Sequence, residues 1–338
     1  MKFGLKSLIF SGIGTLLIGC FIGYAISLEK YNLSTQAPVQ TLPVEIRENQ
    51  SQYQFVNPLL YIGTDKNIYA TQYSGLIDSL DKYISSVTSS KQVANVSVYL
   101  RDLNNGHWTG IGENNLYHPS SMLKVLTIMA ASKKAEDGGL SFNDKLPYTP
   151  GDTNLQYYPP NDNMATGTYS IQDLLQAMVV YSDNGANAAL LSDNMINDEF
   201  TTLYKLFRLP SATSSTADFM SARSYSVIWR TLYNASILSD STSDQILHLL
   251  SYSTFKDGLV AGVPATTTVS HKFGEFTDAT ANGVVLSREL HDCGIVYYPS
   301  HPYFLCVMTR GTDFPNMAKV IAGASKIAYD FTASEYNK

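Results

Sequence analysis

A serine and a lysine three residues apart open a predicted helix that has almost no polar face. The segment runs from His118 through Ser121 and Lys124 into an apolar stretch. Residues three apart share a helix face, and a lysine ammonium among apolar side chains loses its proton more readily than one in water. A neutral lysine beside a serine hydroxyl is what nucleophilic catalysis requires. The spacing therefore predicts Ser121 as nucleophile and Lys124 as its general base.

The Ser-x-x-Lys spacing is common, so its context has to decide which copy is functional. Ser121 lies between Pro119, which favours a helix start, and Gly138, which favours a helix end. In the other copies the lysine lies in polar or helix-end surroundings and stays solvated; these are Ser27 with Lys30, Ser79 with Lys82, and Ser253 with Lys256.

Two further polar motifs follow in the chain. Ser182-Asp183-Asn184 comes directly after the apolar helix expected over residues 171–180, where a polar side chain can point into a cleft. Lys272-Phe273-Gly274 lies in a β-like run. Ser-Asp-Asn recurs at Ser192, and Lys-x-Gly recurs at Lys2 and Lys256. The order along the chain and the surrounding sequence select Ser182 and Lys272.

The pattern of apolar residues predicts strands at both ends of the chain and helices between them. Such segregation favours an α+β fold, with an antiparallel sheet built from both chain ends. The expected strands are 96–100, 108–111, 267–276, 283–288, 291–298 and 303–310, and the expected helices include 76–84, 171–180, 186–195, 200–209, 222–238 and 317–331.

Composition excludes several classes of function. The net charge of -6 and the 15% charged residues leave no basic stripe, so nucleic acid is not an expected partner. The 44% hydrophobic content and 23 tyrosines indicate a well-filled globular core. The cysteines and histidines show no metal-ligand spacing, so no metal or other cofactor is expected.

Residues 7–28 carry no charge and are long enough to span a bilayer. Lys2 and Lys6 precede them and Glu29 follows, which predicts a single-pass protein of the cell membrane with an extracytoplasmic catalytic domain. A cleaved signal peptide and a lipoprotein cleaved at Cys20 are the alternatives. We favour the uncleaved anchor because the apolar run continues past Cys20.

Residues 29–52 are polar and contain two prolines, which predicts a linker, and residues 53–338 are expected to form one domain. Cys293 and Cys306 fall on successive expected strands and could face each other, and an exported protein would permit their oxidation. We nevertheless expect two buried thiols, because directly opposed cysteines fit disulfide geometry poorly.

Together the three motifs resemble those of the penicillin-recognising serine hydrolases, specifically the class A β-lactamase branch. The resemblance covers about residues 53–331. It implies a five-stranded antiparallel sheet flanked by helices, an all-helical subdomain, and a cleft between the two.

The resemblance also implies roles for individual residues. Ser121 attacks a carbonyl carbon, Lys124 takes its proton, and Ser182 relays that proton to the leaving nitrogen. Asn184 holds the substrate amide, and Lys272 supplies positive potential for a substrate carboxylate.

Backbone groups complete the implied site. The N–H groups of Ser121 and of Glu275, next to Gly274 on the strand edge, would bind the tetrahedral oxyanion. His118 and His271 flank two of the motifs and are candidates for lining the cleft.

Two positions depart from the family's pattern. Phe273 stands where the family has a threonine or serine whose hydroxyl binds the substrate carboxylate. The family's water-activating glutamate is also missing, because residues 208–220 contain no glutamate, and Asp198 and Glu199 come too early.

A site that acylates without a water activator forms a long-lived ester, as penicillin-binding proteins do with β-lactams. The sequence therefore favours a membrane-anchored D,D-peptidase acting on peptidoglycan stem peptides. The alternatives are a class A β-lactamase that hydrolyses β-lactam antibiotics and a catalytically idle domain that binds the cell wall.

Overall fold

The computed structural model describes residues 45–47, 54–57, 59–62, 71–154, 156–192, 195–211 and 217–336. The expected membrane span, residues 7–28, lies outside them, and none of the described helices is long and apolar enough to cross a bilayer. Strand β1 (Glu45–Arg47) pairs with β2 (Leu59–Ile62). Strand β1 lies within residues 29–52, for which the sequence predicts a linker.

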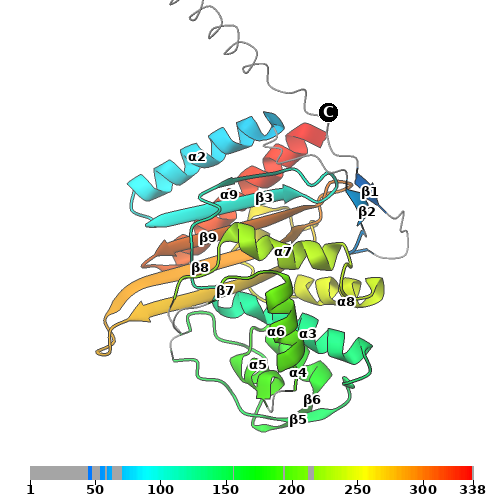
Figure 1. The fold of residues 1–338 in the computed structure, drawn as a ribbon. Helices are drawn as coiled ribbons and strands as arrows, with labels where there is room; N and C mark the ends of the chain where they lie inside the picture. The colour runs from blue at the N-terminus through cyan, green and yellow to red at the C-terminus, as the bar shows by residue number, and fades with distance from the viewer. Residues whose placement is uncertain are drawn as a thin grey trace, which may run out of the picture. The chain divides into compact units, whose positions relative to one another are not determined.

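A five-stranded antiparallel sheet joins the two ends of the domain, with the order β4-β3-β9-β8-β7 (Figure 1). β3 pairs with β9 along its whole length, so strands from both ends of the domain share one sheet, which confirms the expected α+β fold. The strands are β3 (Asn95–Asp102), β4 (Trp108–Ile111), β7 (Val269–Ala279), β8 (Val285–Val296) and β9 (Tyr303–Gly311).

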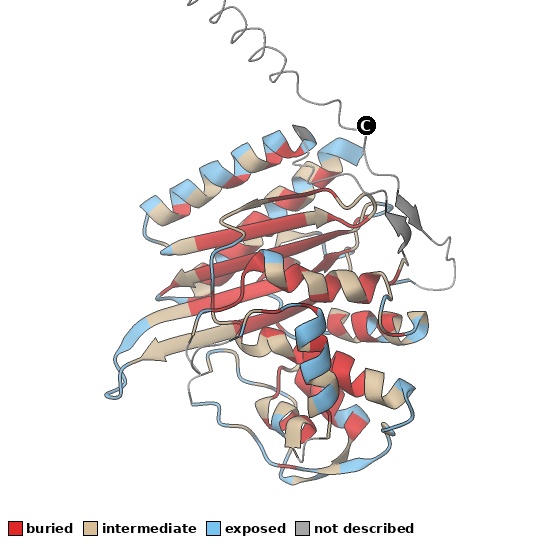
Figure 2. Cartoon of the chain, viewed as in Figure 1, coloured by how far each residue is buried: buried red, intermediate tan, exposed pale blue. Residues whose placement is uncertain are grey.

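Helices cover both faces of this sheet, and the buried residues lie between the layers (Figure 2). On one face α2 (Ser74–Ser89) packs with α9 (Phe314–Tyr336). On the other face α7 (Ala222–Tyr233) and α8 (Asp240–Ser251) contact the sheet. A mainly helical part lies next to them, and it consists of α3 (Lys124–Glu136), α4 (Ile171–Val180), α5 (Asn184–Leu191), α6 (Asn197–Leu206) and the hairpin of β5 (Lys145–Tyr148) and β6 (Gly167–Ser170) (Figure 1). Short 3-10 turns are η1 (Thr71–Tyr73), η2 (Ser120–Leu123) and η4 (Leu259–Gly262).

Cys293 and Cys306 form a disulfide, so the expectation of two free thiols was wrong. They are direct partners across β8 and β9, with 4.0 Å between their Cα atoms. Closely spaced residue pairs on neighbouring antiparallel strands bring opposed side chains near each other. This closeness allows the disulfide, although we expected directly opposed cysteines to fit its geometry poorly. Both cysteines are fully buried, and Cys293 is also opposite Lys272 on β7.

Candidate active site

The nucleophile candidate lies on the 3-10 turn η2, directly before α3. Ser120 has φ 48°, a left-handed conformation that is unfavourable for a residue with a Cβ. The nine residues that begin α3, Lys124 to Ser132, are all buried. The helix therefore lies within the core, as the apolar sequence predicted, and it carries the Lys124 side chain with it.

The Lys124 ammonium is surrounded by oxygen atoms from two motifs. Its Nζ lies 3.0 Å from Ser121 Oγ, 2.7 Å from Asn184 Oδ1 and 3.3 Å from Ser182 Oγ. It also donates to the Ser182 carbonyl at 2.6 Å. The structure thus brings Ser121, Lys124, Ser182 and Asn184 together around one nitrogen atom.

Burial lowers the pKa of Lys124 from 10.5 to about 7, although the nearby carboxylates of Asp183 and Glu275 oppose the shift. Desolvation penalises the charged form of an amine, which explains the direction. A substantial fraction of Lys124 is therefore neutral near pH 7 and can accept the Ser121 proton.

The loop between α4 and α5 holds Ser182 in place. Asp183 caps α5, because its Oδ1 accepts the Ala186 N–H at 2.7 Å. Its Oδ2 accepts the buried Tyr148 hydroxyl at 2.8 Å. Ser182 itself has φ 62°, so these contacts hold it in a conformation that side chains rarely adopt.

Lys272 approaches the same serine from β7. Its Nζ donates to Ser182 Oγ at 2.8 Å and to the Phe273 carbonyl at 3.1 Å. The side chain is fully buried, and this burial, together with the charge of Lys124, holds its pKa well below the usual value. Ser182 Oγ therefore lies between two lysine amines.

Gly274 allows the β7 edge to approach the nucleophile turn closely. A Cβ at this position would lie 2.7 Å from the Pro119 carbonyl oxygen and 3.3 Å from the Met122 nitrogen. Any larger residue would push β7 away from η2. Gly274 therefore positions the neighbouring Glu275 backbone beside Ser121.

The Glu275 side chain has a role that the sequence did not reveal. Its carboxylate accepts the N–H of Tyr157 at 3.0 Å and the N–H of Tyr158 at 3.2 Å. Burial raises the pKa of Glu275 by more than the two amide hydrogen bonds lower it, so the net shift of the pKa is upward. Glu275 thus ties the loop that connects β5 and β6 to the sheet edge.

An aromatic cluster fills the region around Phe273, which is 4% exposed. Phe273 stacks on Phe255 with ring centres 4.4 Å apart. Tyr158 packs edge-on against Phe273 at 5.9 Å and against Phe314 at 6.3 Å. The structure therefore places a packed apolar surface where the family pattern has a hydroxyl.

A cleft of about 460 Å³ opens beside Ser121 and Lys124, and only two carboxylates, Asp152 and Glu275, are among its described lining residues. Glu275 is bound to the two tyrosine amides, and Asp152 accepts the Asn154 N–H. Glu199 instead forms an ion pair with Lys134, with 3.4 Å between Nζ and Oε1. Neither Asp198 nor Glu199 lines the cleft.

A family model described as the beta-lactamase enzyme family matches residues 79–332, which is well over half of the chain. The chain belongs to the beta-lactamase enzyme family. It is accordingly a serine hydrolase with a β-lactamase-like and penicillin-binding-protein-like fold.

Solved structures share this fold at low sequence identity. PBP-A is 17% identical with a TM-score of 0.63, over 77% of this chain and 97% of that one. A beta-lactamase from Xanthomonas campestris is 17% identical, with a TM-score of 0.64, over 76% and 98%. The TLA-1 extended-spectrum beta-lactamase is 20% identical, with a TM-score of 0.63, over 75% and 98%. No curated protein sequence matches the chain.

Neither histidine that flanks the motifs of this hydrolase is among the lining residues of the cleft. His271 is fully buried, and its Nδ1 lies 2.8 Å from Asp292 Oδ1. His118 stacks on Phe276, with ring centres 4.1 Å apart, and its Nδ1 lies 2.9 Å from Ser120 Oγ. His118 therefore supports the nucleophile turn from the side.

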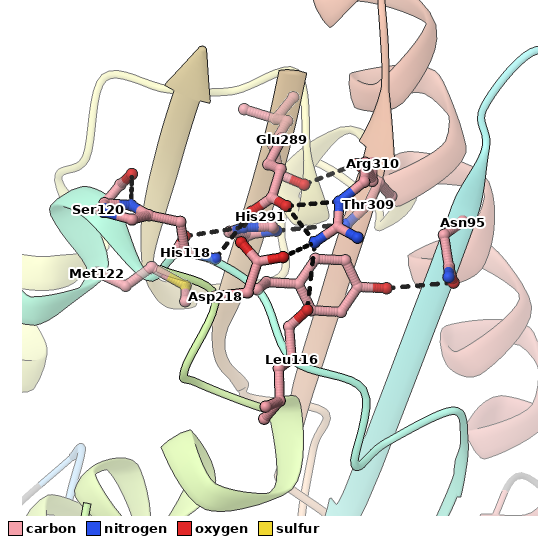
Figure 3. A network of polar contacts seen from close by, with 12 residues as sticks. Asn95, Leu116, His118, Ser120, Met122, Asp218, Glu289, His291, Thr309 and Arg310 are labelled. Atoms are coloured by element: carbon pink, nitrogen blue, oxygen red, sulfur yellow. Dashed lines mark hydrogen bonds and ion pairs between the residues drawn. The ribbon is translucent and has the colours of Figure 1, made fainter. Parts of the chain in front are cut away.

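A buried polar network holds the backbone of His118 (Figure 3). Glu289 accepts the His118 N–H at 2.9 Å, and His291 Nε2 lies 3.2 Å from the His118 carbonyl oxygen. Arg310 Nε donates to Glu289 at 2.7 Å, and its guanidinium also contacts Asp218. The network therefore fixes the chain three residues before Ser121, and the sequence alone gave no sign of it.

Glu289→Ala should lower the free energy of unfolding by about 3 kcal/mol at pH 7, because it leaves Arg310 and the His118 N–H without their buried acceptor. Burial raises the pKa of Glu289, but its bonds from His291, His118 and Arg310 outweigh this and the net shift is downward from 4.5. The stabilisation is therefore complete above pH 4.5 and is lost as pH falls through the lowered pKa.

Urea denaturation across the acid range measures this effect. Asp137→Ala is the matched control, because Asp137 forms an exposed pair with Lys133 and should contribute less than about 1 kcal/mol. Equal losses in the two variants would contradict the role given to Glu289.

Proposed function

We propose that this chain is a membrane-anchored D,D-peptidase that forms an acyl-enzyme at Ser121 and acts on peptidoglycan stem peptides. The observation that carries the proposal is the hydrogen-bonded series from Ser121 through Lys124 and Ser182 to Lys272. It faces a cleft whose two described carboxylates, Asp152 and Glu275, accept backbone N–H groups. Residues 7–28 would anchor it to the cell membrane, with the catalytic domain outside.

The first chemical step is attack on the substrate carbonyl. Neutral Lys124 accepts the Ser121 proton as the Oγ–C bond forms, and the short Nζ to Oγ distance of 3.0 Å suits this transfer. The N–H groups of Ser121 and Glu275 would then stabilise the oxyanion, since β7 approaches η2 closely at Gly274.

The second step breaks the C–N bond. Lys124 returns its proton to Ser182 Oγ, and Ser182 passes its own proton to the leaving nitrogen. Lys272, which donates to Ser182 Oγ at 2.8 Å, keeps this hydroxyl oriented and stabilises negative charge on it. Asn184 would hold the substrate amide while its Oδ1 also fixes Lys124.

Two observations favour a peptidase over a β-lactamase. The two carboxylates of the described cleft lining both accept backbone N–H groups, Asp152 through Oδ1 alone and Glu275 through both oxygens, and neither has a partner that would position it as a dedicated water activator. We therefore expect the ester to persist with β-lactams. A mutant of PBP-A, which has the same fold, has been solved as an acyl-enzyme complex with penicillin G. A β-lactam would therefore act as an inhibitor of this chain more than as a substrate.

Hydrolysis of a peptide ending in D-Ala-D-Ala tests the proposal, with the L-Ala-L-Ala peptide and Ser121→Ala as controls. We expect release of the terminal residue from the D,D peptide alone, inhibition by benzylpenicillin, and no release by the variant. Rapid destruction of benzylpenicillin would instead establish a β-lactamase. Binding of the peptide without any hydrolysis would indicate an idle cell-wall-binding domain.

Phe273→Thr should accelerate acylation by benzylpenicillin about 10-fold, because the new hydroxyl can donate to the drug's carboxylate. The methyl ester of the drug should gain less. Phe255→Thr is the matched control, since it opens the same aromatic cluster without adding a hydroxyl on β7. Stopped-flow acylation rates would measure this, and equal gains in both variants would show that only loosening of the cluster matters.

A further inference from the structure

A second pocket, of about 390 Å³, lies between α7, the β3–β4 hairpin and the end of α6, and has arginines on several sides. We call it the arginine pocket. Four of the seven arginines in the chain line it. Its lining comprises Arg101, Arg208, Arg223, Arg230, Tyr99, Trp108, Asn114, Phe207, Ser221, Ser224, Ser226 and Val227.

The fold collects these arginines from distant parts of the sequence. Arg223, Val227 and Arg230 are spaced four and three residues apart, so they form one stripe of α7. Arg101 on β3 is the cross-strand partner of Trp108 on β4. The Arg223 guanidinium lies 4.3 Å from the centre of the Trp108 ring, which orients it against the hairpin.

The lining of the pocket is positively charged, although Glu113 lies next to it: its Oε1 accepts the side-chain N–H of the lining residue Asn114 at 2.9 Å. No aspartate or glutamate is among its lining residues, although the chain has a net charge of -6. Within the described ranges, Arg101, Arg208 and Arg223 form no ion pair with a carboxylate. Guanidinium groups gathered in this way repel one another, and a bound anion would remove that repulsion.

We propose that the arginine pocket binds a phosphate-bearing ligand. Planar guanidinium groups recognise phosphate through paired hydrogen bonds. One arginine already satisfies a carboxylate, whereas four arginines from different directions match a group with several anionic oxygens. The pocket volume of about 390 Å³ is within the range of small-molecule sites, so the pocket can hold a ligand larger than a single phosphate ion. The phosphate is on either a free metabolite or a diester of a lipid or polymer.

The backbone of Arg208 separates this role from a structural one. Arg208 follows α6 with φ 51°, a position where glycine is usual. Arg208→Gly should therefore leave the melting temperature unchanged or raise it, while it removes one guanidinium from the pocket. If Arg208 served only the fold, Arg208→Gly would lower the melting temperature and leave ligand binding unchanged.

Calorimetric titration of the full chain with inorganic pyrophosphate in about 0.15 M salt tests the proposal, because that salt screens weak surface attraction. We expect saturable binding that Arg101→Gln, Arg223→Gln and Arg208→Gly each weaken about 10-fold. Lys205→Gln, an exposed change of equal charge on α6, should alter affinity less than about twofold. Glycerol 3-phosphate and glycerophosphoglycerol then distinguish a monoester from a diester ligand.

Three results would overturn the proposal. The first is absence of saturable binding by all three phosphate probes. The second is binding that the arginine variants leave unchanged, and the third is binding that citrate matches in affinity. Either of these last two would show attraction to charge without a phosphate site. The readout involves no catalysis, so it stands whether or not the peptidase proposal holds.

Discussion

Replacing Lys124 by methionine should slow acylation of Ser121 by about 10³-fold, because the reaction loses its general base. In the wild-type protein the acylation rate should rise with pH and level off above about 7, where burial places the pKa of Lys124. The protonated amine cannot accept the serine proton, so activity is lost below that pKa. Stopped-flow acylation by a chromogenic cephalosporin across this pH range would measure both effects.

The same variant should unfold at a higher temperature than the wild type. Methionine fills much of the lysine volume without the desolvation penalty of a buried amine. Lys133→Met, nine residues further along α3 and partly exposed, should change neither the acylation rate nor its pH profile. A Lys124→Met protein that retains normal acylation would show that another group takes the proton.

The benzylpenicillin ester of Ser121 should survive long after free drug is removed. We expect deacylation about 10³-fold slower than in an enzyme with a positioned water activator, because Glu275 is bound to the Tyr157 and Tyr158 amides and Glu199 pairs with Lys134. Intact-mass spectrometry at intervals after rapid gel filtration would follow the loss of the adduct.

A carboxylate placed in the cleft should shorten that lifetime. Phe200 on α6 lines the cleft beside Lys124, so Phe200→Glu supplies the missing group, and Thr201→Glu on the exposed side of the same helix is the control. If the wild-type protein loses the benzylpenicillin adduct within the time of a few catalytic turnovers, our account of the missing base is wrong.

The periodic parts of the fold could be predicted from the sequence. Strand β4 and helix α4 begin and end where the apolar pattern placed them. Helix α8 was missed, because its first half is polar and its apolar residues come late, although Ser239 before it is a usable cap signal: its Oγ accepts the Thr242 N–H. We predicted two strands, 283–288 and 291–298, in place of β8, because the charged Glu289 between them is typical of a loop. In the structure Glu289 is opposite Arg310 on β9, so the strand continues through it.

The site was predictable where chemistry depends on local spacing. Ser121 and Lys124 share a turn, and Ser182 follows a helix end, so their positions could be inferred. The carboxylate of Glu275 and the network around His118 could not, because their partners lie more than a hundred residues away in the sequence. Such contacts depend on how the sheet edge meets the helical part.

The left-handed serines beside the nucleophile have a consequence for laboratory evolution. Ser120 and Ser182 have φ values of 48° and 62°, so glycine at either position would relieve backbone strain. At Ser120 the change removes only the side-chain contact with His118, whereas at Ser182 it removes the hydroxyl between two lysines. Selection for heat resistance alone should therefore accept glycine at both positions, whereas selection for turnover should accept it at Ser120 and reject it at Ser182.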